Sequence, residues 1–296
     1  MPSYATLSAT TCPADTTQYF AVRYPTRKPG HVALCAKILH GNTLDPEKII
    51  EWVEMQKILG VDKILVYNLG IPDHIFRVFR FYQFEGIIEI QPYELPGEPE
   101  GRNLSEAFKR TPQFLHDETL AVVECRLRMA GYDYIISHDL DELIIPRENI
   151  SIKQFLQHQT AKHPDAASFF FHTEFFITTW EPTNPEEDLM IKRYRKTTVP
   201  RWECYKYVYL SNRVVTSVTH AVYVIPPYKN VRVPPGDAVL HHYRQCPEDT
   251  WKTCTVPSTV DDVMTRYPGV DERVRAVRVD TKTEPRWKVA PKGLKI

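Results

Sequence analysis

The stretch from Tyr132 to Ile145 constrains the fold more than any other, because an apolar strand runs into a cluster of carboxylates and then returns to apolar residues. Side chains two positions apart on an extended backbone point the same way, so Asp139 and Asp141 present two carboxylates on one face at the end of the strand. Like charges this close in an apolar setting require a cation, a proton or hydrogen-bond donors. Carboxylates bind hard divalent cations, and such a cation also bridges diphosphate oxygens. The stretch therefore indicates a metal site in an enzyme that acts on nucleotide diphosphates.

An acidic turn that caps a helix after a buried strand would contain the same residue types. Apolar residues on both sides, Ile135 and Ile136 before the cluster and 143–145 after it, place it between buried segments instead of on an open surface loop. The capping turn remains the alternative to the metal site.

Length and charge limit the class of protein. A chain of 296 residues can bury a full core, and one catalytic domain with excursions is the simplest account. Its 37 basic and 37 acidic residues balance, and no lysine or arginine run occurs, so the chain lacks the signature of a dedicated nucleic-acid-binding protein. No apolar run reaches the roughly 18 residues of a membrane helix, and residues 1–17 do not form a signal segment. The sequence predicts no nucleic-acid partner and no membrane segment in this chain.

The six cysteines lack the Cys-x-x-Cys spacing of a structural zinc site or a thioredoxin-type redox pair. Cys246 and Cys254 flank a short polar loop and are the first pair in which we expect a disulfide. Cys35 and Cys125 lie in apolar segments, where we expect small buried residues.

The first half alternates strands and helices. After a loose arm rich in Thr, Pro and Ser, the pattern predicts strands over 31–39, 63–68, 87–91 and 132–145, with helices over 45–60, 73–84 and 111–131 between them. Such alternation predicts an α/β fold with a mostly parallel sheet covered on both faces. No GxGxxG or P-loop lysine motif occurs, so neither a classical dinucleotide fold nor an ATPase is supported.

The helix before the acidic strand is expected to bury one stripe formed by Leu120, Val123, Leu127 and Ala130. The second half changes character, with aromatic or alternating strands predicted over 167–176, 205–210, 214–225 and 238–243 that are typical of antiparallel pairing. The loops 181–188 and 226–236 could form an acceptor-binding wall, although surface connections without a task have the same composition.

Several segments occur together in one order: Val32–Lys37, Glu51-Trp52, Leu59–Val61, Val66–Asn68, Glu124–Leu127, Asp139–Glu142, Lys206, His220 and His242–Arg244. In this order they resemble glycosyltransferase family 92, over roughly residues 31–275. The resemblance implies the GT-A nucleotide-diphospho-sugar transferase fold, with a Rossmann-like central sheet and a smaller antiparallel region on the acceptor side. It also implies inverting, metal-dependent transfer of a hexose, galactose in the best-known members, from a UDP-sugar to a glycan acceptor, with manganese as the metal.

The resemblance assigns the metal to Asp139 and Asp141, with Asp141 as the more direct ligand. A late histidine often completes such a site, and imidazole is an acceptable manganese ligand beside carboxylates. His242 fits that role by position, with His241 and His220 as alternatives. Neighbouring residues on a strand face opposite ways, so normally only one of His241 and His242 reaches the site. A half-buried histidine that only bonds to backbone is the other interpretation.

Donor binding is assigned by the same resemblance to Lys37, Asn68, Asp139 and Lys206, with Lys206 facing the diphosphate. A lysine stem that lies over the neighbouring tyrosines with no ligand is the alternative for Lys206.

Inversion requires a base that takes the proton of the acceptor hydroxyl. Glu174 is favoured, because a carboxylate among phenylalanines would have a raised pKa and a fixed position. Glu181, Glu186, Glu187 and Asp188 are the other candidates.

The expected organisation is a flexible arm (1–30), a single catalytic domain with a donor half (31–145) and an acceptor half (146–275), and a polar tail (276–296). The chain departs mildly from the family pattern at three positions. Leu143 stands in place of an aromatic residue, and Glu118 and Glu124 on the preceding helix stand where relatives usually have Gln and Asp.

Members of the family are usually Golgi membrane proteins, so the Golgi lumen is the expected location, although no anchor is visible in this chain. A non-catalytic glycan- or nucleotide-binding relative and a metal-dependent phosphohydrolase are the competing hypotheses.

Overall fold

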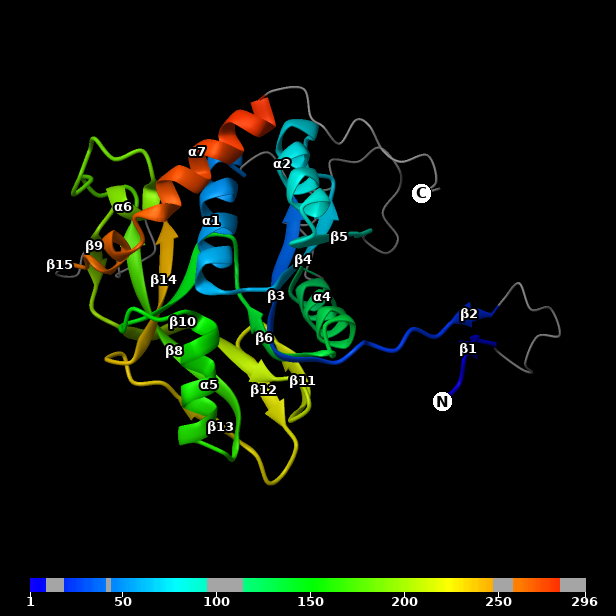
Figure 1. Ribbon diagram of the computed structural model, residues 1–296. Helices are drawn as coiled ribbons and strands as arrows, with labels where there is room; N and C mark the ends of the chain where they lie inside the picture. The colour runs from blue at the N-terminus through cyan, green and yellow to red at the C-terminus, as the bar shows by residue number, and fades with distance from the viewer. Residues whose placement is uncertain (9–18, 41–43, 95–113, 247–257, 283–296) are drawn as a thin grey trace.

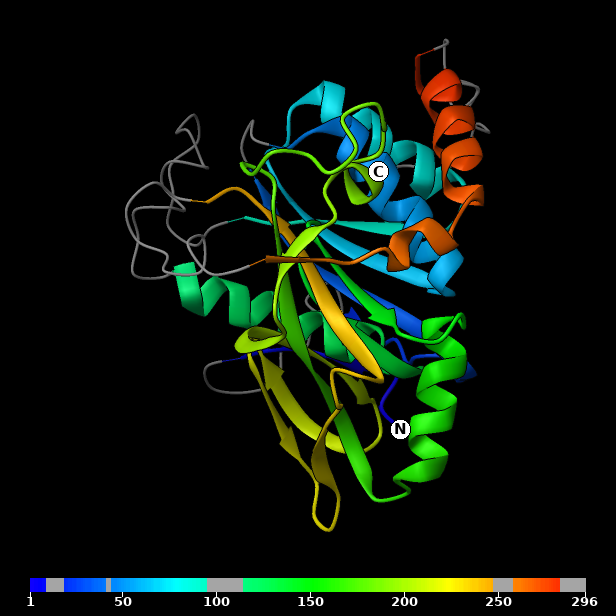
Figure 2. The same ribbon diagram turned by 90° about the vertical axis from the view of Figure 1, so that its left-hand side faces the viewer.

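A computed structural model describes residues 1–8, 19–40, 44–94, 114–246 and 258–282 (Figure 1). Within these residues eleven strands form one large mixed sheet, and two short two-stranded sheets lie apart from it. Figure 2, turned by 90°, shows the long strands β8 and β14 running side by side through the molecule. The expected α/β class, with a parallel part of the sheet and a further part that contains antiparallel pairs, is confirmed.

The parallel half of the sheet has the strand order β6-β3-β4-β5. Its strands are β3 (Lys28–His40), β4 (Lys63–Leu69), β5 (Ile88–Pro92) and β6 (Tyr132–Ser137). The helices that follow β3, β4 and β5 in sequence are α1 (Pro46–Leu59), α2 (Asp73–Phe84) and α4 (Phe114–Arg128). Helices α1 and α2 cover one face and α4 covers the other, so both faces of the strands are apolar.

Helix α1 begins and ends where the sequence predicts. The Asp45 carboxylate accepts a hydrogen bond from the Glu47 backbone N–H at 3.0 Å, Pro46 is the first helical residue, and Gly60 adopts the left-handed conformation with φ 91°. The middle of α1 is buried on all sides, because the sheet curls around it and α7 (Gly269–Lys282) packs on its outer face (Figure 1).

The second half adds antiparallel strands and also parallel ones. Its strands are β7 (Glu142–Pro146), β8 (Ala166–Ile177), β9 (Lys196–Thr198), β10 (Arg201–Leu210), β11 (Val214–Val218), β12 (Ala221–Val224), β13 (Lys229–Arg232), β14 (Ala238–Arg244) and β15 (Ser258–Val260). Strand β10 lies antiparallel to both β6 and β8 and joins the two halves. Strand β14 lies antiparallel to β7 but parallel to β8, so the purely antiparallel pairing expected for 238–243 is wrong. The alternation of apolar and polar residues along a strand indicates which face of the strand is buried. It does not indicate whether a neighbouring strand runs parallel or antiparallel.

The remaining helices of the second half are α5 (Ile152–Lys162), α6 (Met190–Arg193) and the 3-10 helix η3 (Val263–Arg266). In the arm, β1 (Tyr4–Ala5) pairs with β2 (Phe20–Ala21). Strand β3 starts within the expected arm and α7 extends to Lys282, so regular structure crosses both expected boundaries. None of the described helices is long and apolar enough to cross a membrane.

The buried face of α4 differs from the prediction. Leu120 and Leu127 are more than half exposed, and the residues that pack on the sheet are Ala121, Cys125 and Met129. Both sets of positions have helical spacing, and the larger leucines made the wrong set look more apolar. Two of these residues, Ala121 and Cys125, are small, which fits the 6.0 Å between the Cα atoms of Cys35 and Cys125.

A disulfide bridges α4 and the sheet at this contact. Cys35 on β3 and Cys125 on α4 are bonded to each other across 90 residues of sequence, so the expectation that they are merely small buried residues is wrong. Cys246 is also in a disulfide, and because Cys254 lies outside the described residues its pairing with Cys246 stays a prediction. Cys204 is a free thiol.

Candidate active site

The carboxylates of the acidic stretch lie in the turn between β6 and β7, at the edge where the parallel strands end. The turn is closed by Glu142, whose Oε2 accepts a hydrogen bond from the Asp139 backbone N–H at 2.8 Å. The stretch is therefore two strands joined by this turn and not one continuous strand. Both aspartates remain accessible, with side chains 30% exposed for Asp139 and 44% exposed for Asp141.

Two lysines hold Asp139. Its Oδ2 lies 3.0 Å from Lys206 Nζ and 3.3 Å from Lys37 Nζ. Burial alone would raise the pKa of Asp139, but the two ammonium groups outweigh burial and hold that pKa below its ordinary value. Asp139 is therefore ionised at neutral pH, and Lys37 and Lys206, two predicted donor-binding residues, meet at its carboxylate.

The Lys206 ammonium is almost fully buried and makes a second contact, 3.3 Å from Glu142 Oε2. Burial would lower the pKa of Lys206, yet Glu142 and Asp139 raise it above its ordinary value, so the lysine stays charged. For Glu142, burial is the larger effect and raises the pKa of the carboxyl group. The Lys206 ammonium thus contacts two carboxylates, whereas the alternative predicted a lysine that only packs on the neighbouring tyrosines.

His242 on β14 reaches the second aspartate. Its Nε2 lies 3.3 Å from Asp141 Oδ2, and its Nδ1 lies 3.4 Å from Glu142 Oε1. Burial would lower the pKa of His242, but Glu142 and Asp141 raise it above its ordinary value. The buried atoms His242 Nδ1 and Glu142 Oε1 have no partner at hydrogen-bonding geometry.

The donor atoms of Asp141 and His242 fit a divalent cation. Two ligand atoms about 2.1 Å from one ion, at a right angle, lie about 3 Å apart, close to the observed separation. Glu142 is placed to orient the imidazole from behind, as the outer partners of metal-bound histidines do. Asp139 fits less well as a direct ligand, because its Oδ2 already contacts two ammonium groups.

Glu174, the favoured base, lies elsewhere. His241 and His242 point to opposite faces of β14, and Glu174 shares the side of His241, 3.8 Å from its Nε2. Arg147 lies 2.5 Å from Glu174 Oε1 and 2.5 Å from Asp261 Oδ2. Burial raises the pKa of Glu174 to about 7 despite the arginine. The structure does not bring Glu174 together with Asp139 and Asp141.

Glu174, His241 and Asp261 form the one group among the described residues whose possible metal-binding atoms lie within 4.8 Å of one another. Asp139, Asp141 and His242 are more widely spread than this. The guanidinium of Arg147 already compensates the carboxylates of the first group, and a cation beside it would be repelled. Lys37 and Lys206 contact Asp139 Oδ2 and not the Asp141 carboxylate, so the Asp141 and His242 pair is the better candidate for a cation site.

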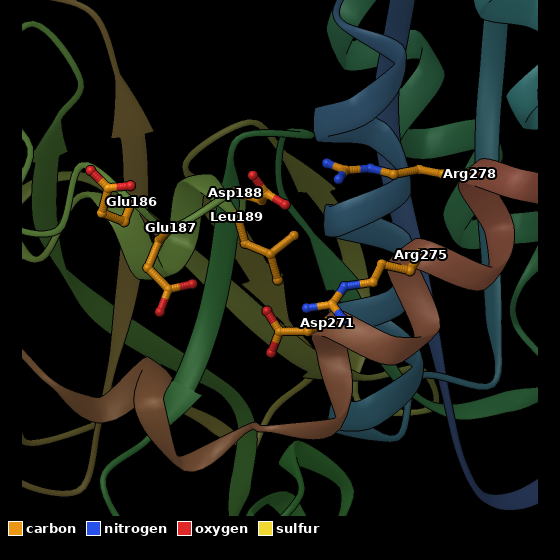
Figure 3. Close-up of a pocket in the computed structure, with 7 residues that line it drawn as sticks. All are labelled: Glu186, Glu187, Asp188, Leu189, Asp271, Arg275 and Arg278. Carbon is orange, nitrogen blue, oxygen red and sulfur yellow. The ribbon is translucent and has the colours of Figure 1, made fainter.

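The other predicted residues lie outside the acidic cluster. Asn68 Oδ1 accepts a hydrogen bond from the Ile71 N–H at 2.9 Å and shapes the turn after β4. His220 lies in the turn between β11 and β12, and its Nδ1 is 2.9 Å from the Tyr205 carbonyl oxygen. Figure 3 shows Glu186, Glu187 and Asp188 lining a cavity opposite α7, and Glu181 is exposed.

The sequence reasoning missed two carboxylates that support the cluster. Glu142 is fully buried at the start of a buried strand, and a charged residue in that position requires buried partners, which was the available signal. Glu118 on α4 lies 3.4 Å from Lys37 Nζ and accepts a hydrogen bond from Thr219 Oγ1 at 3.2 Å. No local pattern indicated that Glu118 would reach Lys37, because the contact crosses between α4 and β3.

The chain is similar to a β-1,4-galactosyltransferase, galt-1, of Caenorhabditis elegans, with 25% identity over 118 residues, which are 39% of this chain and 25% of that protein. The match thus spans only a quarter of the length of the curated relative.

Solved structures with partial likeness include one described as a glucose-1-phosphate thymidylyltransferase from Bacillus anthracis, with TM-score 0.32 and 11% identity, covering 62% of this chain and 72% of that one. Another is TarS residues 1–349 of S. aureus, with TM-score 0.29 and 8% identity, covering 61% of this chain and 47% of that one. The sequence profile of glycosyltransferase family 92 matches residues 30–276, which include every residue of the acidic cluster. This chain belongs to glycosyltransferase family 92.

Proposed function

We propose that the protein is an inverting, metal-dependent glycosyltransferase that moves a hexose, galactose, from a UDP-sugar to a glycan acceptor. The observation that carries the proposal is the joined cluster at the edge of the parallel strands: Asp141 and His242 offer ligand atoms 3.3 Å apart, and Lys206 and Lys37 present two ammonium groups beside them. A cation site next to fixed positive charge suits a diphosphate leaving group.

In this proposal Asp141 and His242 would hold the manganese ion, and Glu142 faces the His242 ring from behind, with its Oε1 3.4 Å from Nδ1. A bound divalent cation supplies Lewis acidity that stabilises negative charge on the departing diphosphate. Asp139 keeps the two lysines charged and fixed in position. Lys37, the more exposed of the two, would then donate to the same diphosphate, the buried Lys206 would add positive charge behind Asp139, and Asn68 would border the donor from the end of β4. Glu174 receives no catalytic role here, because Arg147 engages it on the other face of β14.

The proposal keeps one catalytic domain with a donor half (31–145) and an acceptor half (146–275), and Lys206 and His242 of the second half reach Asp139 and Asp141 of the first. It also places the protein in the Golgi lumen. The Cys35–Cys125 bond supports this location, since disulfides persist in oxidising compartments.

Calorimetric binding of UDP tests the proposal, with and without manganese, on the wild type and on Asp141→Asn. Manganese-dependent binding by the wild type that is lost in the variant is the expected result. Glu181→Gln, an exposed carboxylate away from the cluster, should bind like the wild type. Absence of UDP binding to folded wild-type protein under both conditions would refute the proposal. Binding of UDP-galactose without turnover on any acceptor would instead favour a non-catalytic relative.

A further inference from the structure

The turn that joins β7 to α5 carries the tripeptide Asn149-Ile150-Ser151. An asparagine followed two positions later by serine, with any residue except proline between them, is the acceptor pattern for N-linked glycosylation. This pattern is short and occurs by chance in many chains, so the surroundings of the asparagine decide whether it can carry a glycan. A second copy, Asn103-Leu104-Ser105, lies outside the described residues.

The three residues of the tripeptide have different surroundings. Ile150 is half-buried and packs against the apolar core, whereas Asn149 is exposed. Ser151 caps α5, because its Oγ accepts a hydrogen bond from the Gln154 N–H at 3.1 Å. Ile150 and Ser151 thus fix the turn, and Asn149 is left on its solvent side.

The conformation of the turn does not require asparagine at position 149. Asparagine is common in turns because it tolerates left-handed backbone and because its side chain hydrogen-bonds to nearby backbone. Among the described residues Cys204 is the one non-glycine residue with a positive φ, so Asn149 does not use the first property. Its side-chain amide makes no hydrogen bond within the part of the chain that the structure describes. A sugar bonded to Asn149 Nδ2 would therefore break no contact of the fold.

The turn also lies away from the acidic cluster. Asp141 precedes β7 and Asn149 follows its other end, so the whole strand separates the two residues. The five residues of β7 span roughly 16 Å at about 3.3 Å per residue. A glycan on Asn149 would leave the proposed donor site open.

We propose that Asn149 carries an N-linked oligosaccharide. In this reaction Asn149 Nδ2 bonds to C1 of the first sugar and loses one proton. The donor is a lipid-linked oligosaccharide, whose lipid diphosphate leaves with the electron pair of the broken C–O bond. Because Ser151 Oγ is engaged in the helix cap of the folded chain, the oligosaccharide must be attached before α5 forms.

This inference goes beyond the proposed transfer activity and concerns a modification of the protein itself. It rests on one part of the proposed function, the luminal location, which the Cys35–Cys125 disulfide supports.

The helix cap allows matched variants. Ser151→Thr keeps both the acceptor pattern and a hydroxyl cap, whereas Ser151→Asp keeps a capping side chain and removes the pattern. Asn149→Gln removes the acceptor nitrogen and retains an exposed amide.

The test uses the full chain, expressed in animal cells behind a cleavable secretory signal. Protein from the medium and from the cells is treated with peptide N-glycosidase in heavy-oxygen water. This enzyme converts a glycosylated asparagine into an aspartate that contains heavy oxygen. Mass spectrometry of the peptide around residue 149 detects the aspartate separately from any change at Asn103.

The wild type and Ser151→Thr should contain heavy aspartate at position 149, and Ser151→Asp should contain unmodified asparagine there. Asn149→Gln and Ser151→Asp should both migrate faster than the wild type in gel electrophoresis before glycosidase treatment and equally after it. All four proteins should bind UDP in the presence of manganese with the same affinity, because the turn is remote from the acidic cluster.

Unmodified Asn149 in the wild-type protein would overturn the proposal. Heavy aspartate at position 149 in Ser151→Asp would also overturn it, because the modification would then not depend on the acceptor pattern. Absence of UDP binding by all four proteins would refute the proposed function, whatever the state of Asn149, so the two failures are distinguishable.

Discussion

His242 Nε2 lies 3.3 Å from Asp141 Oδ2, although the two residues are 101 positions apart in the sequence and come from β14 and the turn after β6. The register of β14 on β7 causes this meeting, because His242 pairs with Glu142, the residue directly after Asp141. A shift of this register by one residue would present His241 instead.

The first prediction concerns this pair. His242→Ala should weaken manganese-dependent UDP binding at least tenfold, because one of two ligand atoms is removed. His220→Ala removes a histidine whose Nδ1 lies 2.9 Å from the Tyr205 carbonyl oxygen on β10, and it should leave this binding unchanged. Titration of UDP in the presence of manganese measures both. Equal losses in the two variants would contradict the assignment of His242.

Lys206 should matter for stability as well as for binding. Lys206→Met leaves Asp139 and the buried Glu142 without their shared counter-charge and should lower the free energy of unfolding by about 3 to 5 kcal/mol. Lys153→Met breaks a more exposed ion pair with Asp62 and should cost about 1 kcal/mol or less. Urea unfolding of the two variants compares the costs, and similar values would show that the Lys206 network is not effectively buried.

Glu174 should make stability depend on pH. Burial raises the pKa of Glu174 from 4.5 to about 7, so the folded state holds a proton that the unfolded state has released between these values. The unfolded state binds fewer protons in this window, and the free energy of unfolding should therefore fall as pH rises from about 4.5 to 7, by about 3 kcal/mol from this group. Glu174→Gln should remove that part of the slope.

Urea unfolding at about pH 5 and about pH 7.5 measures the difference between wild type and Glu174→Gln. Glu51, whose pKa burial also raises to about 7, contributes to both proteins equally and cancels in the comparison. An unchanged slope in the variant would mean that Arg147 keeps Glu174 ionised throughout.

The disulfide should stabilise the contact between β3 and α4. Replacing both partners, Cys35→Ala with Cys125→Ala, releases a loop of about 90 residues in the unfolded chain and should lower the free energy of unfolding by about 4 kcal/mol. Cys204→Ser alters a free thiol and should have a small effect. Thermal and urea unfolding measure both changes, and equal effects would contradict a bond between Cys35 and Cys125.

The sequence alone determined the local elements and the chemistry of the acidic turn. Asp45, Pro46 and Gly60 specify the ends of α1 because capping and left-handed backbone are local preferences. Apolar strands alternating with helices specified a parallel sheet, since such strands must be covered on both faces. The pairing of Asp139 and Asp141 in one acidic cluster was predicted from residue type and spacing. The order of the motifs along the chain indicated its family.

The tertiary structure decided what depends on contacts between distant segments. The register of β14 selected His242 over His241, and the same register put Glu174 on the opposite side with Arg147. The face of α4 and the Cys35–Cys125 bond depend on how closely a helix approaches the sheet, which two overlapping helical stripes leave undetermined. Side-chain periodicity specifies how one element alternates, whereas only packing specifies which neighbour each face meets.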